Sequence, residues 1–109
     1  MKRTLLNKIG KVGRANLKAN KELAKMWVEK GIVSCEIRLE GCLGQWLIQN
    51  VHRHKRWLYR ANLEQLSDFS QVVRGCQACH QKIENDKLLT QIIFTKLRGK
   101  DNLKRETNI

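Results

Sequence analysis

The residues best suited to chemistry in this sequence are its three histidines. His52 and His54 lie two residues apart in the stretch HRHKR, and His80 directly follows the last cysteine. A neutral imidazole binds transition metals, and it also accepts protons near neutral pH. A single histidine is more often a surface or packed residue than a ligand. All three nevertheless fall within or beside the segment that the cysteines bracket, so they are candidates for a metal site and a general base.

The four cysteines form two pairs, Cys35 with Cys42 and Cys76 with Cys79. The second pair is a C-x-x-C at the start of an expected helix, which points both sulfurs at one ion. The first pair is separated by six residues, more than the two to four that are usual in a zinc knuckle. In a reducing compartment paired cysteines indicate metal ligands before disulfides. The pattern predicts one structural Zn²⁺ held by all four sulfurs.

Three alternatives to this zinc site stay open. The thiols could be buried and free, or Cys76 and Cys79 could form a redox pair, although the βαβ context of such a pair is missing. His80 could also replace one cysteine as a zinc ligand. A four-sulfur site has the advantage that it uses every cysteine and fastens the first loop to the last helix.

Hydrophobic spacing predicts the elements that must position these residues. It predicts a helix over 15–30, with Asn16 as its cap and Gly31 as its stop. It then predicts a strand over 45–54, a short helix over 60–67 and a second, antiparallel strand over 69–73. A long helical pattern over 77–97 ends at Gly99. We expect an α+β domain in which His52 and His54 share one strand face and meet His80 from the last helix.

The length of 109 residues suits one domain with a modest core. Residues 1–14 are basic and contain Gly10 and Gly13, so we expect a flexible arm there. We expect the folded domain over 15–99, with its zinc-stapled core over 34–86. Residues 100–109 are polar and are expected to form a disordered tail.

The charge balance points to a polyanionic partner. Lys and Arg outnumber Asp and Glu by 22 to 10, which gives a formal net charge of +12 and a pI near 10.0. Double-stranded DNA is therefore the leading partner. A membrane surface is less favoured, because no apolar helical face accompanies the charge. No signal peptide or membrane span is expected, so we predict an intracellular, cytoplasmic protein.

Basic residues near the histidines are the expected DNA contacts. They can hold the phosphates that flank a cut site, and Arg56 could also stabilise developing charge. Trp57 and Tyr59 are expected in the core rather than stacked on bases. No recognition helix is visible, so binding should be sequence-tolerant and strongly salt-dependent. The residues in this set are Arg53, Lys55, Arg56, Arg60, Arg74 and Lys82.

These residues resemble a known family over about half of the chain, from Ser34 to Asp86. The resemblance is to the HNH (ββα-metal) endonucleases in their zinc-stapled form, and within them to small free-standing phage-type proteins. It rests on Cys35-Glu36, a strand that ends in histidines, and the run Cys76-x-x-Cys79-His80-x-Lys82-Ile83. It implies that the first strand supplies a metal ligand and a general-base histidine, and that the last helix supplies a further ligand. Carried over, His54 is the base, while His52 and His80 hold a catalytic divalent ion such as Mg²⁺, Mn²⁺ or Ni²⁺.

The sequence departs from the family pattern at two positions. Arg53 separates two histidines that are usually adjacent, so the roles of His52 and His54 are open to exchange. The family's loop-organising Asn falls near Ser70 or Gln71, and Gln71 is expected to take its place. We therefore expect a metal-dependent DNA endonuclease or nicking enzyme. The alternative is a non-catalytic, zinc-stabilised nucleic-acid-binding protein on a degenerate HNH fold. A nuclease toxin with an inhibitor partner is a third reading that no residue specifically supports.

Overall fold

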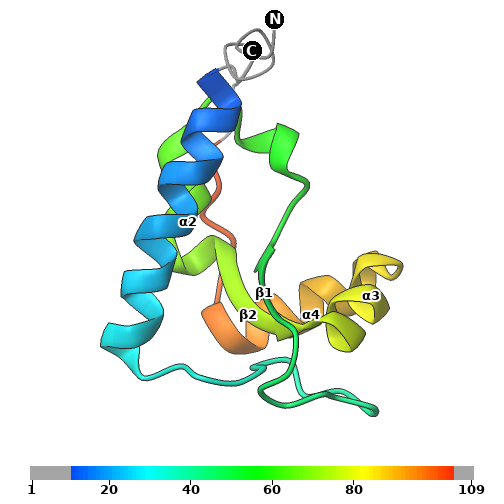
Figure 1. Cartoon of the computed structure of the whole chain (residues 1–109). Helices are drawn as coiled ribbons and strands as arrows, with labels where there is room; N and C mark the ends of the chain where they lie inside the picture. Colours follow the sequence, from blue (N-terminus) through cyan, green and yellow to red (C-terminus); the bar gives the residue numbers. More distant parts are fainter. Residues whose placement is uncertain (1–10, 105–109) are drawn as a thin grey trace, which may run out of the picture.

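The computed structural model describes residues 11–104 as a small α+β domain (Figure 1). Helix α2 (Lys11–Lys30) is followed by a loop and by strand β1 (Ile48–His52). Three 3-10 turns, η1 (Arg56–Tyr59), η2 (Leu63–Ser67) and η3 (Phe69–Gln71), lead to strand β2 (Val72–Cys76). Helices α3 (Gln77–Glu84) and α4 (Lys87–Arg98) complete the domain. Within the described part of the chain, no helix is both long enough and apolar enough to cross a bilayer.

Helix α2 begins earlier than the sequence predicted. Gly13 lies inside the helix and Asn16 occupies its interior, so the prediction that Asn16 caps it is wrong. One glycine costs a helix only about 1 kcal/mol, which packing of the buried Ala19, Leu23 and Trp27 offsets. Residues 1–10 of the expected arm lie outside the described residues.

The predicted antiparallel pairing of two strands is confirmed, with different bounds. β1 pairs with β2 in a register that sets His52 opposite Val72 and Ile48 opposite Cys76. β1 is shorter than expected because residues 44–47 form a turn in which Leu47 has a φ of 50°. β2 starts later than expected because the Asp68 carboxylate accepts a hydrogen bond from the Ser70 amide, 2.9 Å long, and stabilises η3.

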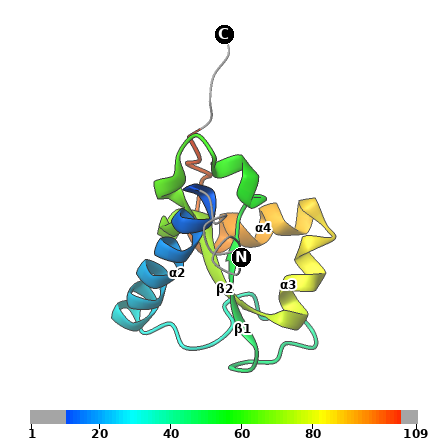
Figure 2. The same ribbon diagram turned by 45° about the horizontal axis from the view of Figure 1, so that its top comes forward.

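The helices lie on both sides of this two-stranded sheet. In Figures 1 and 2, α2 lies on one side of the strands, and α3 and α4 lie on the other. Val51 and Val73, which are paired, pack with Ile83 and Phe94 from the two C-terminal helices. Val72 packs instead with residues of α2. The hairpin is thus covered on both faces.

The single helix predicted over 77–97 is interrupted. α3 ends before Asn85, and the Asp86 carboxylate accepts a hydrogen bond from the Leu89 amide at the start of α4. Gly99 ends α4 with a φ of 81°, as predicted. The following segment, 101–104, was expected to be frayed, but it makes hydrogen bonds with Gln65 and Gln71. Residues 105–109 lie outside the described residues.

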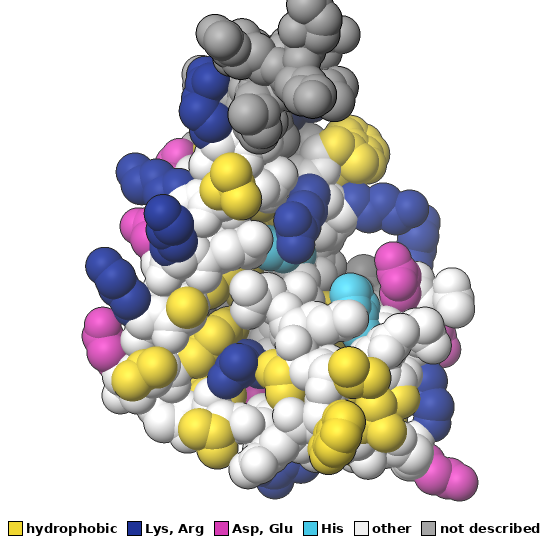
Figure 3. Space-filling view, viewed as in Figure 1, with side chains coloured by type: hydrophobic (Ala, Val, Ile, Leu, Met, Phe, Trp, Pro, Cys, Tyr) yellow, Lys and Arg dark blue, Asp and Glu magenta, His cyan; other side chains and the backbone are white. Residues whose placement is uncertain are grey.

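Positive side chains are spread widely over the surface. Figure 3 shows Lys and Arg at many places on one face, with fewer Asp and Glu side chains. Imidazoles are visible at two places near the middle of this face.

Candidate functional site

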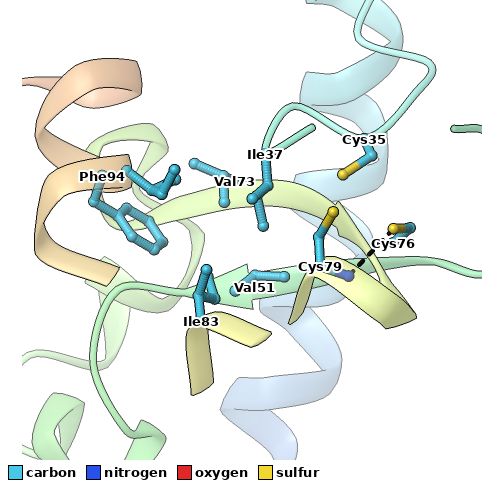
Figure 4. Close-up of a cluster of buried hydrophobic side chains, with 9 residues drawn as sticks. Cys35, Ile37, Val51, Val73, Cys76, Cys79, Ile83 and Phe94 are labelled. Carbon is cyan, nitrogen blue, oxygen red and sulfur yellow. Dashed lines mark hydrogen bonds between the residues drawn. The ribbon is translucent and has the colours of Figure 1, made fainter. Parts of the chain in front are cut away.

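The four cysteines form one group of potential metal ligands. The Sγ atoms of Cys35, Cys42, Cys76 and Cys79 all lie within 4.8 Å of one another, and three of the four residues are buried. Figure 4 shows the sulfurs of Cys35, Cys76 and Cys79 at one end of the core between the sheet and the helices. Four sulfurs at this spacing fit a tetrahedral Zn²⁺.

The wide spacing of the first cysteine pair is accommodated by a curled loop. Arg38 and Gly41 have φ values of 53° and 83°, and the Cys42 amide donates to the Leu39 carbonyl in a 2.9 Å turn. The loop is tied to the rest of the fold by the partly buried Glu36, whose carboxylate accepts from the Arg74 amide and from the Arg98 guanidinium. These contacts return Cys42 to the side of Cys76.

Backbone amides point at the sulfurs, as expected for thiolates. The amides of Leu43 and Cys79 donate to Sγ of Cys76 at 3.3 and 3.4 Å. Burial raises the pKa of Cys76, but these amides outweigh it and bring the pKa to about 6. Burial and the neighbouring thiols instead raise the pKa of Cys79 to about 12. A divalent cation such as Zn²⁺ among the four sulfurs would hold all of them as thiolates.

His52 is held in a mostly buried position at the end of β1. Its Nε2 donates to the Leu66 carbonyl at 2.7 Å, which leaves Nδ1 as the unprotonated nitrogen. Nδ1 is buried and has no hydrogen-bond partner among the described residues. Burial outweighs the hydrogen bond to Leu66, which raises the pKa of His52, and together with the nearby charges of Arg56 and His80 it lowers this pKa to about 4. His52 is therefore neutral at physiological pH.

His54 lies beyond the end of β1 and contacts the C-terminal segment. Its Nε2 donates to the Asp101 carboxylate at 2.5 Å, and its backbone amide donates to the Tyr59 hydroxyl. Nδ1 has no partner within residues 11–104 and, unlike Nδ1 of His52, is not buried. This nitrogen is open to a solvent molecule or a substrate.

His80 lies in the first half of α3, against the strand β1. Its Nδ1 is 2.7 Å from Oε1 of Gln49, so Nδ1 carries the proton and Nε2 keeps its lone pair. Metal-binding histidines are commonly oriented in this way by an acceptor on the other nitrogen. Gln49 was not predicted as a site residue, and no short-range signal identifies it.

The structure does not gather the three imidazoles into one ligand set. Among residues 11–104 only the cysteines form a group of three or more potential ligands. His52 faces η2, whereas His80 contacts Gln49 on the side of α3. Each imidazole thus has its own acceptor, and within residues 11–104 the ring nitrogens that remain without partners are Nδ1 of His52, Nδ1 of His54 and Nε2 of His80.

Gln71, the predicted loop-organising residue, is fully buried beside His54. Its Oε1 accepts from the Tyr59 hydroxyl at 2.9 Å, and its Nε2 donates to Asp101 and Asn102 at 2.8 and 2.7 Å. It therefore joins three segments that are distant in sequence. Asp101 is, after Gln49, a second site residue that was not predicted, because it lies 47 positions from His54 in a segment expected to be disordered.

The predicted phosphate contacts divide into two classes. Arg53 and Arg74 are half-buried and donate to the backbone carbonyls of Gly99 and Ile32, so they stabilise the fold. The side chains of the other four are exposed. Trp57, expected in the core, is 59% exposed on η1, whereas Tyr59 is buried as expected. The exposed cations are Lys55, Arg56, Arg60 and Lys82.

Comparisons with protein-family models, with curated proteins and with solved structures found no match to this chain. The site must therefore be interpreted from its own geometry.

Proposed function

We propose that this protein is a zinc-stapled, metal-dependent DNA endonuclease or nicking enzyme of the HNH (ββα-metal) type. The observation that carries the proposal is the contact between His80 and Gln49, beside the four-cysteine group. This contact holds His80 of α3 against β1, the first strand of the antiparallel pair. The other end of β1 carries His52. This order of strand, strand and helix, with histidines on the first strand and the helix, is the arrangement that the family resemblance implies.

His54 is the general base in this proposal. Its unprotonated Nδ1 accepts a proton from water as the water oxygen attacks phosphorus. The bond from phosphorus to the leaving oxygen breaks, and that oxygen takes a proton from solvent. Nδ1 is suited to this role because it is accessible, whereas Nδ1 of His52 is buried.

Two of the three ring nitrogens without partners would hold a divalent ion. These are Nε2 of His80 and the orphaned Nδ1 of His52, and phosphate oxygens and water would complete the ligand set. When bound, such an ion neutralises charge on the phosphoryl oxygens.

Exposed cations near His54 would hold the nucleic acid. Lys55, Arg56 and Arg60 are all exposed around the exposed Trp57. Each phosphate contact contributes a slope of about −0.9 to the dependence of log K on log salt. We expect a slope of about −3 or steeper for duplex DNA, and a slope about one unit shallower in an Arg60→Ala variant.

A plasmid assay tests the enzyme. Zinc-loaded protein is incubated with supercoiled plasmid and with Mg²⁺, Mn²⁺ or Ni²⁺, or with EDTA. We expect metal-dependent nicking, lost by at least 10²-fold in His54→Ala and in His80→Ala. Lys96→Ala, which removes an exposed cation from α4, serves as the matched control and should nick normally. Cleavage that is equal in the wild type and His54→Ala would refute the assigned base.

The second candidate is a zinc-stabilised nucleic-acid-binding protein without catalysis. It is favoured by the separate protein partners of the three imidazoles. Retardation of DNA in a gel, with no cleavage in any of the metals, would support this candidate and reject the enzyme.

A further inference from the structure

The segment that follows α4 turns back onto the end of β1 and is anchored there. Asp101 reaches His54, Asn102 contacts Gln71 and Gln65, and the Lys104 amide donates to the Gln65 side chain at 2.7 Å. Gln65 and Gln71 are buried, so the contacts are made to fixed groups rather than to mobile surface side chains. The C-terminal segment is therefore part of the candidate site.

The carboxylate of Asp101 is fixed at both oxygens. Oδ2 accepts from Nε2 of His54, while Oδ1 accepts from Nε2 of Gln71 at 2.8 Å and from the Leu103 amide at 3.0 Å. Burial raises the pKa of Asp101, but these donors outweigh it and lower the pKa to about 2. The group is thus an oriented carboxylate at neutral pH.

The donors that hold Asp101 are themselves held. Gln71 accepts from the hydroxyl of Tyr59, which is fully buried, and that hydroxyl accepts from the His54 backbone amide. The network therefore closes on the same residue, joining the backbone of His54 to its ring. A surface ion pair is worth little because its side chains are free to move. Here both partners are restrained, so the contact can select one ring tautomer.

We propose that Asp101 is a positioning residue for His54, which holds its ring with the proton on Nε2 and the lone pair of Nδ1 toward the substrate. This inference deepens the proposed function and rests on it for its catalytic consequence. The carboxylate also stabilises the imidazolium that forms when Nδ1 takes a proton, without becoming protonated itself. The assignment of the tautomer stands on the geometry alone.

The tautomer is measured directly by long-range ¹H–¹⁵N correlation spectra of the full-length, zinc-loaded protein. We expect an Nε2–H signature for His54 in the wild type and in Asp101→Glu. In Asp101→Asn, whose amide can donate to the ring, we expect a shift toward Nδ1–H. Lys100→Ala is the matched control, because it changes an exposed side chain of the same segment that makes no hydrogen bond with His54, Gln71 or Asp101. Zinc content and chemical-shift dispersion show that each variant is folded.

Kinetics then test the consequence. In Asp101→Asn we expect kcat to fall about 10²- to 10⁴-fold while KM changes little, and we expect Asp101→Glu to recover part of the loss. An Nδ1–H ring in the wild type, or an unchanged tautomer in Asp101→Asn, would overturn the inference. If the wild type cleaves nothing in any metal, the proposed function fails, whereas the spectra still decide whether Asp101 positions the ring.

Discussion

Replacing Gln71 by methionine should be among the most damaging single changes at this site. Methionine has a similar volume and no hydrogen-bonding amide, so the substitution removes polar contacts without opening a large cavity. Gln71 is fully buried and makes hydrogen bonds to Tyr59, Asp101 and Asn102. The variant therefore isolates the contribution of this hydrogen-bond network.

The magnitude follows from which partners water can reach. The hydroxyl of Tyr59 is buried and would lose its acceptor, which costs about 1–3 kcal/mol. Asp101 would lose a charge-assisted bond but is partly exposed, so we add only about 1 kcal/mol. Asn102 is exposed and water can replace its bond. The free energy of unfolding should fall by about 2–4 kcal/mol, or the Tm by about 10–20 °C.

Urea unfolding in saturating zinc, followed by tryptophan fluorescence, measures this change. The double variant Gln71→Met/Tyr59→Phe removes both ends of the buried bond, so its cost should be at least 0.5 kcal/mol below the sum of the single variants. A loss under about 0.5 kcal/mol in Gln71→Met, or strict additivity in the cycle, would refute the reasoning.

Three further predictions concern the metal, the pH and the core. Removing zinc with a chelator should abolish cooperative unfolding, because such a site contributes on the order of 10 kcal/mol; circular dichroism that is unchanged without metal would contradict it. Between pH 6.5 and about 4 the unfolded chain binds a proton at His52 that the folded chain does not. The free energy of unfolding should therefore decrease as the pH is lowered, by about 1.4 kcal/mol per pH unit and about 3 kcal/mol in all. Urea titrations at several pH values should show a shallower fall in His52→Gln, and equal slopes would argue against a buried neutral ring. In Gly75→Ala the new Cβ would lie 2.6 Å from Cδ1 of Ile37, so the free energy of unfolding should fall by about 1–3 kcal/mol. Adding Ile37→Val, which removes Cδ1, should restore part of the lost stability, and urea midpoints of the two variants measure both effects.

Local patterns in the sequence predicted most of the secondary structure. The apolar spacing that predicted a helix over 15–30 is the face that packs on the sheet through Leu23 and Trp27. The antiparallel strand pair and the stop at Gly99 are also confirmed. The wrong predictions concern the ends of elements. At Asp86, for example, the apolar pattern runs on without a break, but the Asp86 carboxylate caps a new helix and divides the predicted one.

Side-chain environments were predicted less well than the helices and strands. Trp57 was expected in the core, but it is 59% exposed. Ile92 lies within the helical pattern over 77–97 but is 54% exposed. The break after α3 changes the direction of α4. An apolar face assigned along one straight helix therefore does not match the buried face of α4.

The residue types and spacing by themselves indicated that the cysteines could form one ligand group, because a C-x-x-C at a helix start points two sulfurs at one ion and the other two cysteines supply the remaining ligands. They also determined the basic surface, because charge does not depend on the fold. Only the tertiary structure decided that the imidazoles take Leu66, Asp101 and Gln49 as separate partners. These contacts join positions 14 to 47 residues apart, and their formation depends on how the loops close around the core, which no local pattern encodes.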